Sequence, residues 1–126
     1  EKLDHIRKRN DSRLIYTYGV KQGIITLTDM VKLLSTNAAQ LFGMPDRGTV
    51  TAGAKADIVV WDPNEKGIIS HRTNAHNCDN SPFEGFKYEG AAKHVFLNGV
   101  HAVKDGELIA ENSGKFIKRE RCGFYR

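Results

Sequence analysis

The chain has 126 residues, enough for one domain with a core of moderate size. Hydrophobic residues make up 40% and charged residues 27%, as in soluble globular proteins, and no apolar run approaches the roughly 18–20 residues of a membrane helix. The net charge is +4, and the excess lies largely in residues 1–13 and in the tail. We expect solvated basic ends rather than a nucleic-acid site, because no recognised nucleic-acid module accompanies them.

The start of the chain and its cysteines predict a piece of a longer, cytoplasmic protein. The sequence begins at Glu1 with neither an initiator methionine nor a secretory leader. Its two cysteines, Cys78 and Cys122, are too few and too far apart for a disulfide framework. We therefore expect reduced thiols.

Residues 1–13 form a charged lead-in with weak helical spacing at Leu3 and Ile6. This pattern fits either a frayed helix end or a disordered segment. The next residues, Leu14–Tyr18, are more apolar and stop at Gly19. We expect a short extended piece there, or the remnant of a loop.

A helix is predicted to begin after Thr26. Thr26 and Asp29 fit a variant of the capping box, in which the threonine oxygen accepts a free N–H at the helix start. An apolar stripe follows at the spacing i, i+3, i+4, i+7, formed by Leu27, Met30, Val31 and Leu34. Such a stripe predicts a helix that buries one face.

A second short helix is predicted directly afterwards. Ser35–Asn37 interrupts the pattern and offers a new N-cap for a helix over Ala38–Phe42. Gly43 lies where a left-handed C-cap belongs. Residues 14–47 therefore contain two consecutive short helices.

The stretch Gly48–Pro63 predicts a loop and then one strand of a buried sheet. Ile58–Trp61 is rich in β-branched and aromatic residues, which favours a strand. Proline cannot donate to a sheet ladder, so Pro63 is expected to end it. Asp57 and Asp62 flank the run and are expected to cap backbone N–H groups at its two ends.

The remaining sequence predicts an antiparallel meander over residues 92–109, within the segment 48–112. Ile68–Ser70 could form a short strand, and the long loop 71–90 is polar and without period. Two-residue turns at Asn98-Gly99 and Asp105-Gly106 are strong hairpin signals. The strands that they join are Ala92–Leu97, Val100–Val103 and Glu107–Ile109. A basic tail follows at residues 113–126. Because the predicted helices precede the predicted strands along the chain, the sequence indicates an α+β fold.

The loop holds a cluster that resembles metal ligands: His71, His76, Cys78 and Asp79. Their spacing matches no standard zinc pattern, and a structural site needs four convergent ligands. A structural loop is therefore favoured over a metal site. Cys78 as a nucleophile would need a base, and His76 is close in sequence, but an idle thiol is the preferred interpretation.

Two further features have ordinary explanations. His94 and His101 fall within the predicted hairpin, where a histidine is more often a surface or cross-strand residue than a catalyst. Gly48 and Gly53 are too far apart for a phosphate-binding loop and precede a strand instead of a helix.

Three segments together resemble the C-terminal part of the D-hydantoinase/dihydropyrimidinase family of cyclic amidohydrolases. Leu34–Gly43 is similar to the family's STNAAKIFGL helix, and Gly48–Pro63 is similar to its KGxIxxGxDADIVIWDP stretch. Asn77–Gly85 resembles NCDYNPFEG, which points to hydantoinases more narrowly. The resemblance covers roughly residues 14–119, whereas residues 1–13 depart from the family pattern.

The resemblance implies an α+β fragment: the last helices of a (β/α)8 metal-dependent hydrolase barrel, then part of a small antiparallel β-sandwich. It implies a parent enzyme that opens hydantoins or dihydropyrimidines at a binuclear zinc centre, or one with another divalent metal. It also implies a homotetramer with the C-terminal region near a subunit interface, and no nucleic-acid or membrane partner.

The family's metal ligands are a His-x-His pair, a carbamylated lysine, two further histidines and an aspartate, none of which matches this chain. We assign no catalytic, substrate-binding or metal residue here, Asn10 included, and expect the isolated chain to be inactive. Two alternatives remain open: a non-enzymatic dihydropyrimidinase-like scaffold or assembly protein, and an independent basic binding domain whose nucleic-acid retention would be salt-sensitive. We also expect the isolated chain to be poorly soluble or partly molten, because its apolar stripe would lack a partner.

Overall fold

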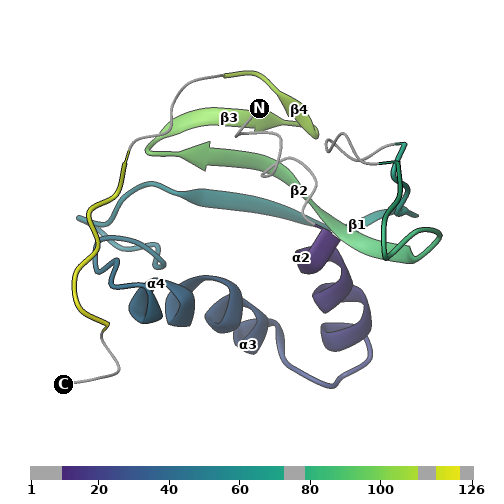
Figure 1. The fold of residues 1–126 in the computed structure, drawn as a ribbon, viewed down its shortest axis with the longest axis horizontal. Helices are drawn as coiled ribbons and strands as arrows, with labels where there is room; N and C mark the ends of the chain where they lie inside the picture. Colours follow the sequence, from purple (N-terminus) through teal and green to yellow (C-terminus); the bar gives the residue numbers. More distant parts are fainter. Residues whose placement is uncertain (1–9, 73–78, 111–115, 123–126) are drawn as a thin grey trace.

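The computed structural model describes residues 10–72, 79–110 and 116–122. The described helical segments lie on one side of a single antiparallel sheet (Figure 1). The helical segments are α2 (Asn10–Ile15), η1 (Tyr16–Val20), α3 (Leu27–Val31), η2 (Lys32–Thr36) and α4 (Asn37–Leu41). The strands are β1 (Ile58–Ile68), β2 (Lys87–Leu97), β3 (Val100–Lys104) and β4 (Glu107–Leu108). This arrangement confirms the predicted α+β class.

The first helical segment corrects the extended piece predicted for Leu14–Tyr18. α2 continues into η1, a π-helical turn in which the N–H of Lys21 donates to the carbonyl of Tyr16 at 2.9 Å. The helix buries Tyr16, which is 8% exposed, and places its ring 5.6 Å from that of Trp61. This tertiary contact has no signature in the local sequence.

The capping box at Thr26 is confirmed. The Thr26 hydroxyl accepts from the Asp29 N–H at 3.1 Å, and the Asp29 carboxylate accepts from the Thr26 N–H at 3.1 Å. These two bonds satisfy donors that a helix start leaves free. Gly43 ends the segment with φ +64°, in the left-handed conformation predicted for it.

The predicted break at Ser35–Asn37 is wrong. α3, η2 and α4 follow one another without interruption, and Thr36 stays helical with φ −62° and ψ −51°. The Ser35 and Thr36 hydroxyls do not cap a new helix; they donate to the carbonyl of Gly48 at 3.3 and 2.9 Å. Instead of a break between two helices, the structure therefore has a π-helical turn whose hydroxyl groups bind the following loop at Gly48.

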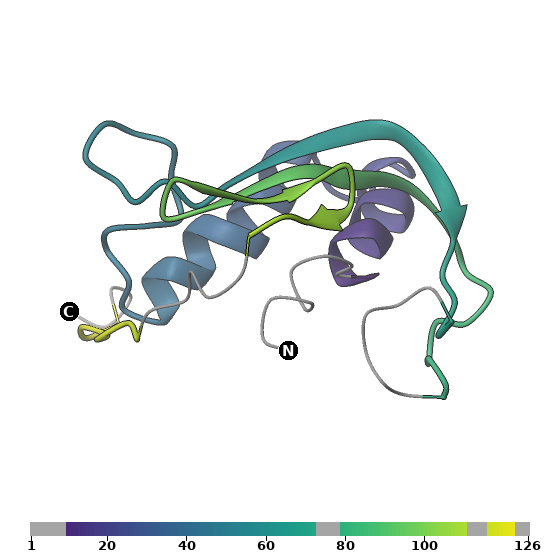
Figure 2. The same cartoon turned by 90° about the horizontal axis from the view of Figure 1, so that it is seen from above.

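The sheet has the order β1-β2-β3-β4, with every neighbouring pair antiparallel, so the predicted meander is confirmed. Both hairpin turns have two residues with positive φ: Asn98 at 49°, Gly99 at 80°, Asp105 at 50° and Gly106 at 76°. This is the pattern of a type I′ turn, which matches the twist of the flanking strands. Seen from above, β1 and β2 arch over the helices (Figure 2).

β1 is longer and more exposed than predicted. Pro63 does not end it, because the register shifts between Asp62 and Lys66 and leaves the proline outside the paired positions. Val59 and Val60 are 55% and 44% exposed, so this edge strand is not fully buried. β2 in turn begins at Lys87, inside the loop predicted for residues 71–90.

The core is small and joins the two layers. Its buried hydrophobic members are Tyr16, Met30, Ala39, Ile69, Ala91, Val95, Ala102 and Val103. Gly90, with φ +77°, lies between the layers, where a Cβ atom would meet Trp61 at 2.7 Å and Tyr16 at 2.8 Å. No helix in the part of the chain that the structure describes is long and apolar enough to cross a membrane.

Candidate functional site

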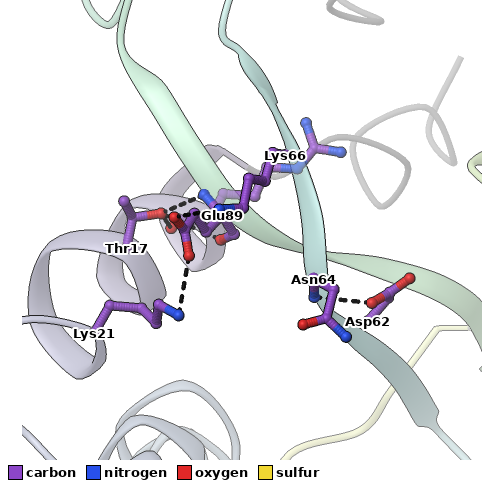
Figure 3. A network of polar contacts seen from close by, with 7 residues as sticks. Thr17, Lys21, Asp62, Asn64, Lys66 and Glu89 are labelled. Atoms are coloured by element: carbon purple, nitrogen blue, oxygen red, sulfur yellow. Dashed lines mark hydrogen bonds and ion pairs between the residues drawn. The ribbon is translucent and has the colours of Figure 1, made fainter.

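Among the residues that the structure describes, a cluster of polar contacts surrounds Glu89 on β2 (Figure 3). Its carboxylate accepts from Lys21 and from Lys66, each at 3.0 Å, so it joins the helical layer to β1. The hydrogen bond from Lys21, and then the one from Lys66, holds the pKa of Glu89 below its usual value. The Glu89 N–H also donates to the Thr17 hydroxyl at 2.9 Å.

No local pattern in the sequence indicates this cluster, because Thr17 and Glu89 are 72 residues apart. Nor does the cluster hold a pair suited to catalysis. Every oxygen of the carboxylate faces an ammonium group, and the Thr17 hydroxyl faces two backbone carbonyls, those of Arg13 and Glu89. A hydroxyl nucleophile needs a base that takes its proton. The cluster therefore has a structural role, because it joins the helical layer to the sheet.

Asp57 and Asp62 cap backbone N–H groups, as predicted. Asp57 accepts from the N–H of Asn98 at 2.8 Å, and Asp62 accepts from the N–H of Asn64 at 2.9 Å. The second oxygen of Asp57 binds the Arg47 guanidinium at 2.6 Å, a contact that the sequence did not indicate. The Arg47–Asp57 pair thus links the loop before β1 to the first hairpin turn.

A cleft of about 760 Å³ lies beside this pair, between the loop 44–47 and the tail segment 116–120. Its described lining is mixed: basic and acidic side chains lie among apolar groups such as Leu97, and the charged ones are Asp46, Arg47, Lys55, Lys118 and Glu120. No serine, cysteine or histidine is among these lining residues. Within the described residues the cleft therefore has no serine–histidine or cysteine–histidine pair, and its ionisable lining groups are lysine, arginine and carboxylate side chains.

The loop before β2 is closed by a contact between its ends. Glu84 accepts from the His71 N–H at 2.6 Å and lies 3.1 Å from the His71 ring nitrogen. The hydrogen bond from the His71 backbone, followed by one from the Ser70 hydroxyl, lowers the pKa of Glu84. His76 and Cys78 lie outside the described residues, so the structure does not test the predicted loop cluster or the Cys78 nucleophile.

The described residues do not fit the metal centre that the resemblance implies. Within residues 10–72, 79–110 and 116–122, no three histidine, cysteine, aspartate or glutamate side chains gather closely enough to hold a metal ion. No catalytic step through a metal can be built from them. His94 and His101 lie side by side on β2 and β3, as the cross-strand interpretation predicted, with ring nitrogens 3.2 Å apart.

The helical layer leaves several large apolar side chains exposed to solvent. Seven large apolar side chains along residues 24–42 are exposed, Leu33 among them. We call the other six the apolar helix face: Ile24, Leu27, Val31, Leu34, Leu41 and Phe42. Met30 of the predicted stripe is instead buried, with 6% exposure. Exposed large apolar side chains gathered in one segment indicate a surface that packs on a partner.

Comparison with known proteins identifies the relatives of the chain. Residues 4–102 match the model of the amidohydrolase family. The chain is 43% identical to a D-hydantoinase of Ralstonia pickettii over 115 residues, 88% of this chain and 25% of that protein. It is 34% identical to a dihydropyrimidinase of Dictyostelium discoideum over 112 residues, 87% of this chain and 22% of that protein.

The structural comparison agrees. A D-hydantoinase (dihydropyrimidinase) from Thermus sp. matches with a TM-score of 0.84 and 42% identity, covering 90% of this chain and 25% of that one. The chain thus spans about a quarter of the length of the relatives that it matches. Because the family model covers residues 4–102, the chain belongs to the amidohydrolase family.

Proposed function

We propose that the chain is the C-terminal part of a hydrolase that opens cyclic amides, namely hydantoins or dihydropyrimidines. The observation that carries this proposal is the 43% identity to a D-hydantoinase over 88% of the chain. A second support is that the other relatives compared are also named as enzymes of this kind. A non-enzymatic scaffold is therefore the less favoured alternative.

The reaction adds one water molecule across a ring amide. Hydroxide attacks the ring carbonyl, the C–N bond breaks, and the released nitrogen takes a proton, so a cyclic amide becomes an open-chain carboxylate. In the parent protein a binuclear zinc centre, or one with another divalent metal, would supply water with a lowered pKa and polarise the carbonyl. Its ligands would come from residues upstream of this chain.

The role that we assign to this chain is support for that chemistry. The segment from α3 to α4 would be the last helical part of the barrel, with the apolar helix face packed on the rest of it. The sheet β1–β4 would form part of a small β-sandwich, and the tail would lie near a subunit interface of a homotetramer. The exposure of Leu27, Val31 and Leu41, between 51% and 54%, supports a missing packing partner.

A chimera tests the proposal. The matched segment of the R. pickettii D-hydantoinase is replaced with this chain, and hydantoin ring opening is assayed with zinc present. We expect the chimera to hydrolyse hydantoin and this chain alone to show no hydrolysis. A folded, zinc-loaded chimera without activity would contradict the proposal.

The control is a chimera whose inserted segment carries Met30→Lys. Met30 is 6% exposed, so a charge there would lack water or a partner and should prevent folding. This control distinguishes loss of the fold from loss of compatibility with the enzyme.

A further inference from the structure

Two histidines meet on the sheet in an arrangement that resembles half of a metal site. The Nδ1 atom of His94 on β2 lies 3.2 Å from the Nε2 atom of His101 on β3. Two nitrogen ligands at about 2.0–2.1 Å from a zinc ion, with a tetrahedral angle between them, are about 3.3 Å apart. The two ring nitrogens are thus already separated by the span of a two-ligand chelate.

The position of His101 is supported by its neighbour. Its ring stacks on that of Phe96, with centroids 4.5 Å apart and planes 14° apart. This stacking restricts the plane of the imidazole, while its Nε2 atom stays 3.2 Å from the Nδ1 atom of His94. A ligand held in place before binding loses less conformational freedom when the metal arrives.

The pair is accessible and chemically suited to a divalent transition metal. Both rings are half-buried, so water and ions reach them. Neutral imidazole is the commonest metal ligand in proteins. Because each facing nitrogen must be unprotonated to bind, the proton now shared between them would move to the outer nitrogen of its own ring by a tautomer change, and no proton need be released.

We propose that His94 and His101 form a two-histidine site for Zn²⁺, with water filling the remaining coordination positions. No third histidine, cysteine or carboxylate completes the site among the described residues, so binding should be weaker than at a four-ligand zinc site. The register also places Lys104 opposite His94 on the same face of the sheet. Its exposed ammonium group repels a cation and weakens the site further.

The test is a titration of the full chain with Zn²⁺, followed through the imidazole Cε1–H signals in NMR spectra. It is carried out in a Leu27→Glu/Val31→Lys background, which replaces two exposed apolar side chains far from the two histidines in sequence and limits self-association. We expect the His94 and His101 signals to shift together, and at lower Zn²⁺ than the His71 signal. In His94→Gln the His101 shift should need at least about tenfold more Zn²⁺, since losing even an outer partner of a ligand costs about 10- to 100-fold in metal affinity. His71→Gln is the matched control and should leave both shifts unchanged.

Lys104→Glu provides an independent arm that does not remove a ring. It replaces the repelling charge with a carboxylate at an exposed position, so the fold should persist and the His94 and His101 shifts should need less Zn²⁺. Circular dichroism checks that each variant keeps its sheet. The proposal would be overturned if the His94 and His101 signals responded to Zn²⁺ independently of each other in the Leu27→Glu/Val31→Lys background. It would also be overturned if the Zn²⁺ response of the His101 signal were the same with and without His94→Gln, or with and without Lys104→Glu.

Discussion

The apolar helix face makes a quantitative prediction about the isolated chain. Full burial of a large aliphatic or aromatic side chain contributes about 1.5–3 kcal/mol. Leu27, Val31, Leu41 and Phe42 keep between 50% and 54% of their surface exposed, and Ile24 keeps 72%. About half of each contribution is therefore unrealised, roughly 1 kcal/mol per side chain and about 6 kcal/mol over the six residues.

That sum is comparable with the whole stability of a typical domain, about 5–15 kcal/mol. We therefore expect the chain to self-associate and to bind a hydrophobic dye such as ANS. The double variant Leu27→Glu/Val31→Lys removes two adjacent members of the face at exposed positions. It should shift sedimentation velocity profiles from broad, fast species towards the monomer and reduce ANS fluorescence.

The neighbouring position provides the control. Met30→Lys places the same charge one residue away, but on a side chain that is 6% exposed. It should destroy the fold instead of improving solubility, because a buried unpaired charge is costly. A monodisperse wild-type monomer that binds no ANS and melts in one sharp transition would refute this reasoning.

The other predictions are measured in the Leu27→Glu/Val31→Lys background. Gly90→Ala should destabilise the fold by about 1–3 kcal/mol more than Gly106→Ala, measured by urea unfolding with the fluorescence of the single tryptophan. The two glycines have similar φ values, +77° and +76°, but only at Gly90 would a Cβ atom clash with neighbouring side chains. Equal losses of stability in the two variants would contradict this. Thr26→Ala should cost about 0.5–2 kcal/mol by loss of the cap, and an unchanged urea midpoint would argue against the capping box. The hydrogen bond from Lys21 lowers the pKa of Glu89 from its ordinary value of 4.5. The ionised carboxylate therefore stabilises the fold above pH 4.5, and this stabilisation is lost as the pH falls through the lowered pKa of the folded state. A pH titration of the Glu89 carboxyl signal by NMR should show a higher pKa in Lys21→Met.

Features that depend only on residues close together in the sequence were predictable. The Thr26–Asp29 capping box, the left-handed Gly43 and both two-residue turns depend on local chemistry, and the structure contains all of them. The caps made by Asp57 and Asp62 were likewise predictable from their positions at the ends of an apolar run.

Features that depend on contacts between residues far apart in the sequence were not predictable from local patterns. Leu14–Tyr18 is helical because Tyr16 packs on Trp61, and Pro63 is tolerated because β1 bulges at the sheet edge. The absence of a break near Thr36 depends on a bond to Gly48, twelve residues away. Among the sites, the Glu89 cluster joins three separate segments, so no local motif could reveal it.

Complementation in trans tests most directly whether the chain supplies packing surface without chemistry. The R. pickettii D-hydantoinase, truncated of its matched segment, is co-expressed with this chain, and hydantoin ring opening is measured. We predict that the wild-type chain restores hydrolysis, that Leu27→Glu/Val31→Lys does not, and that the chain alone hydrolyses nothing. Equal restoration by the wild type and the double variant, or hydrolysis by the metal-loaded chain on its own, would contradict this account.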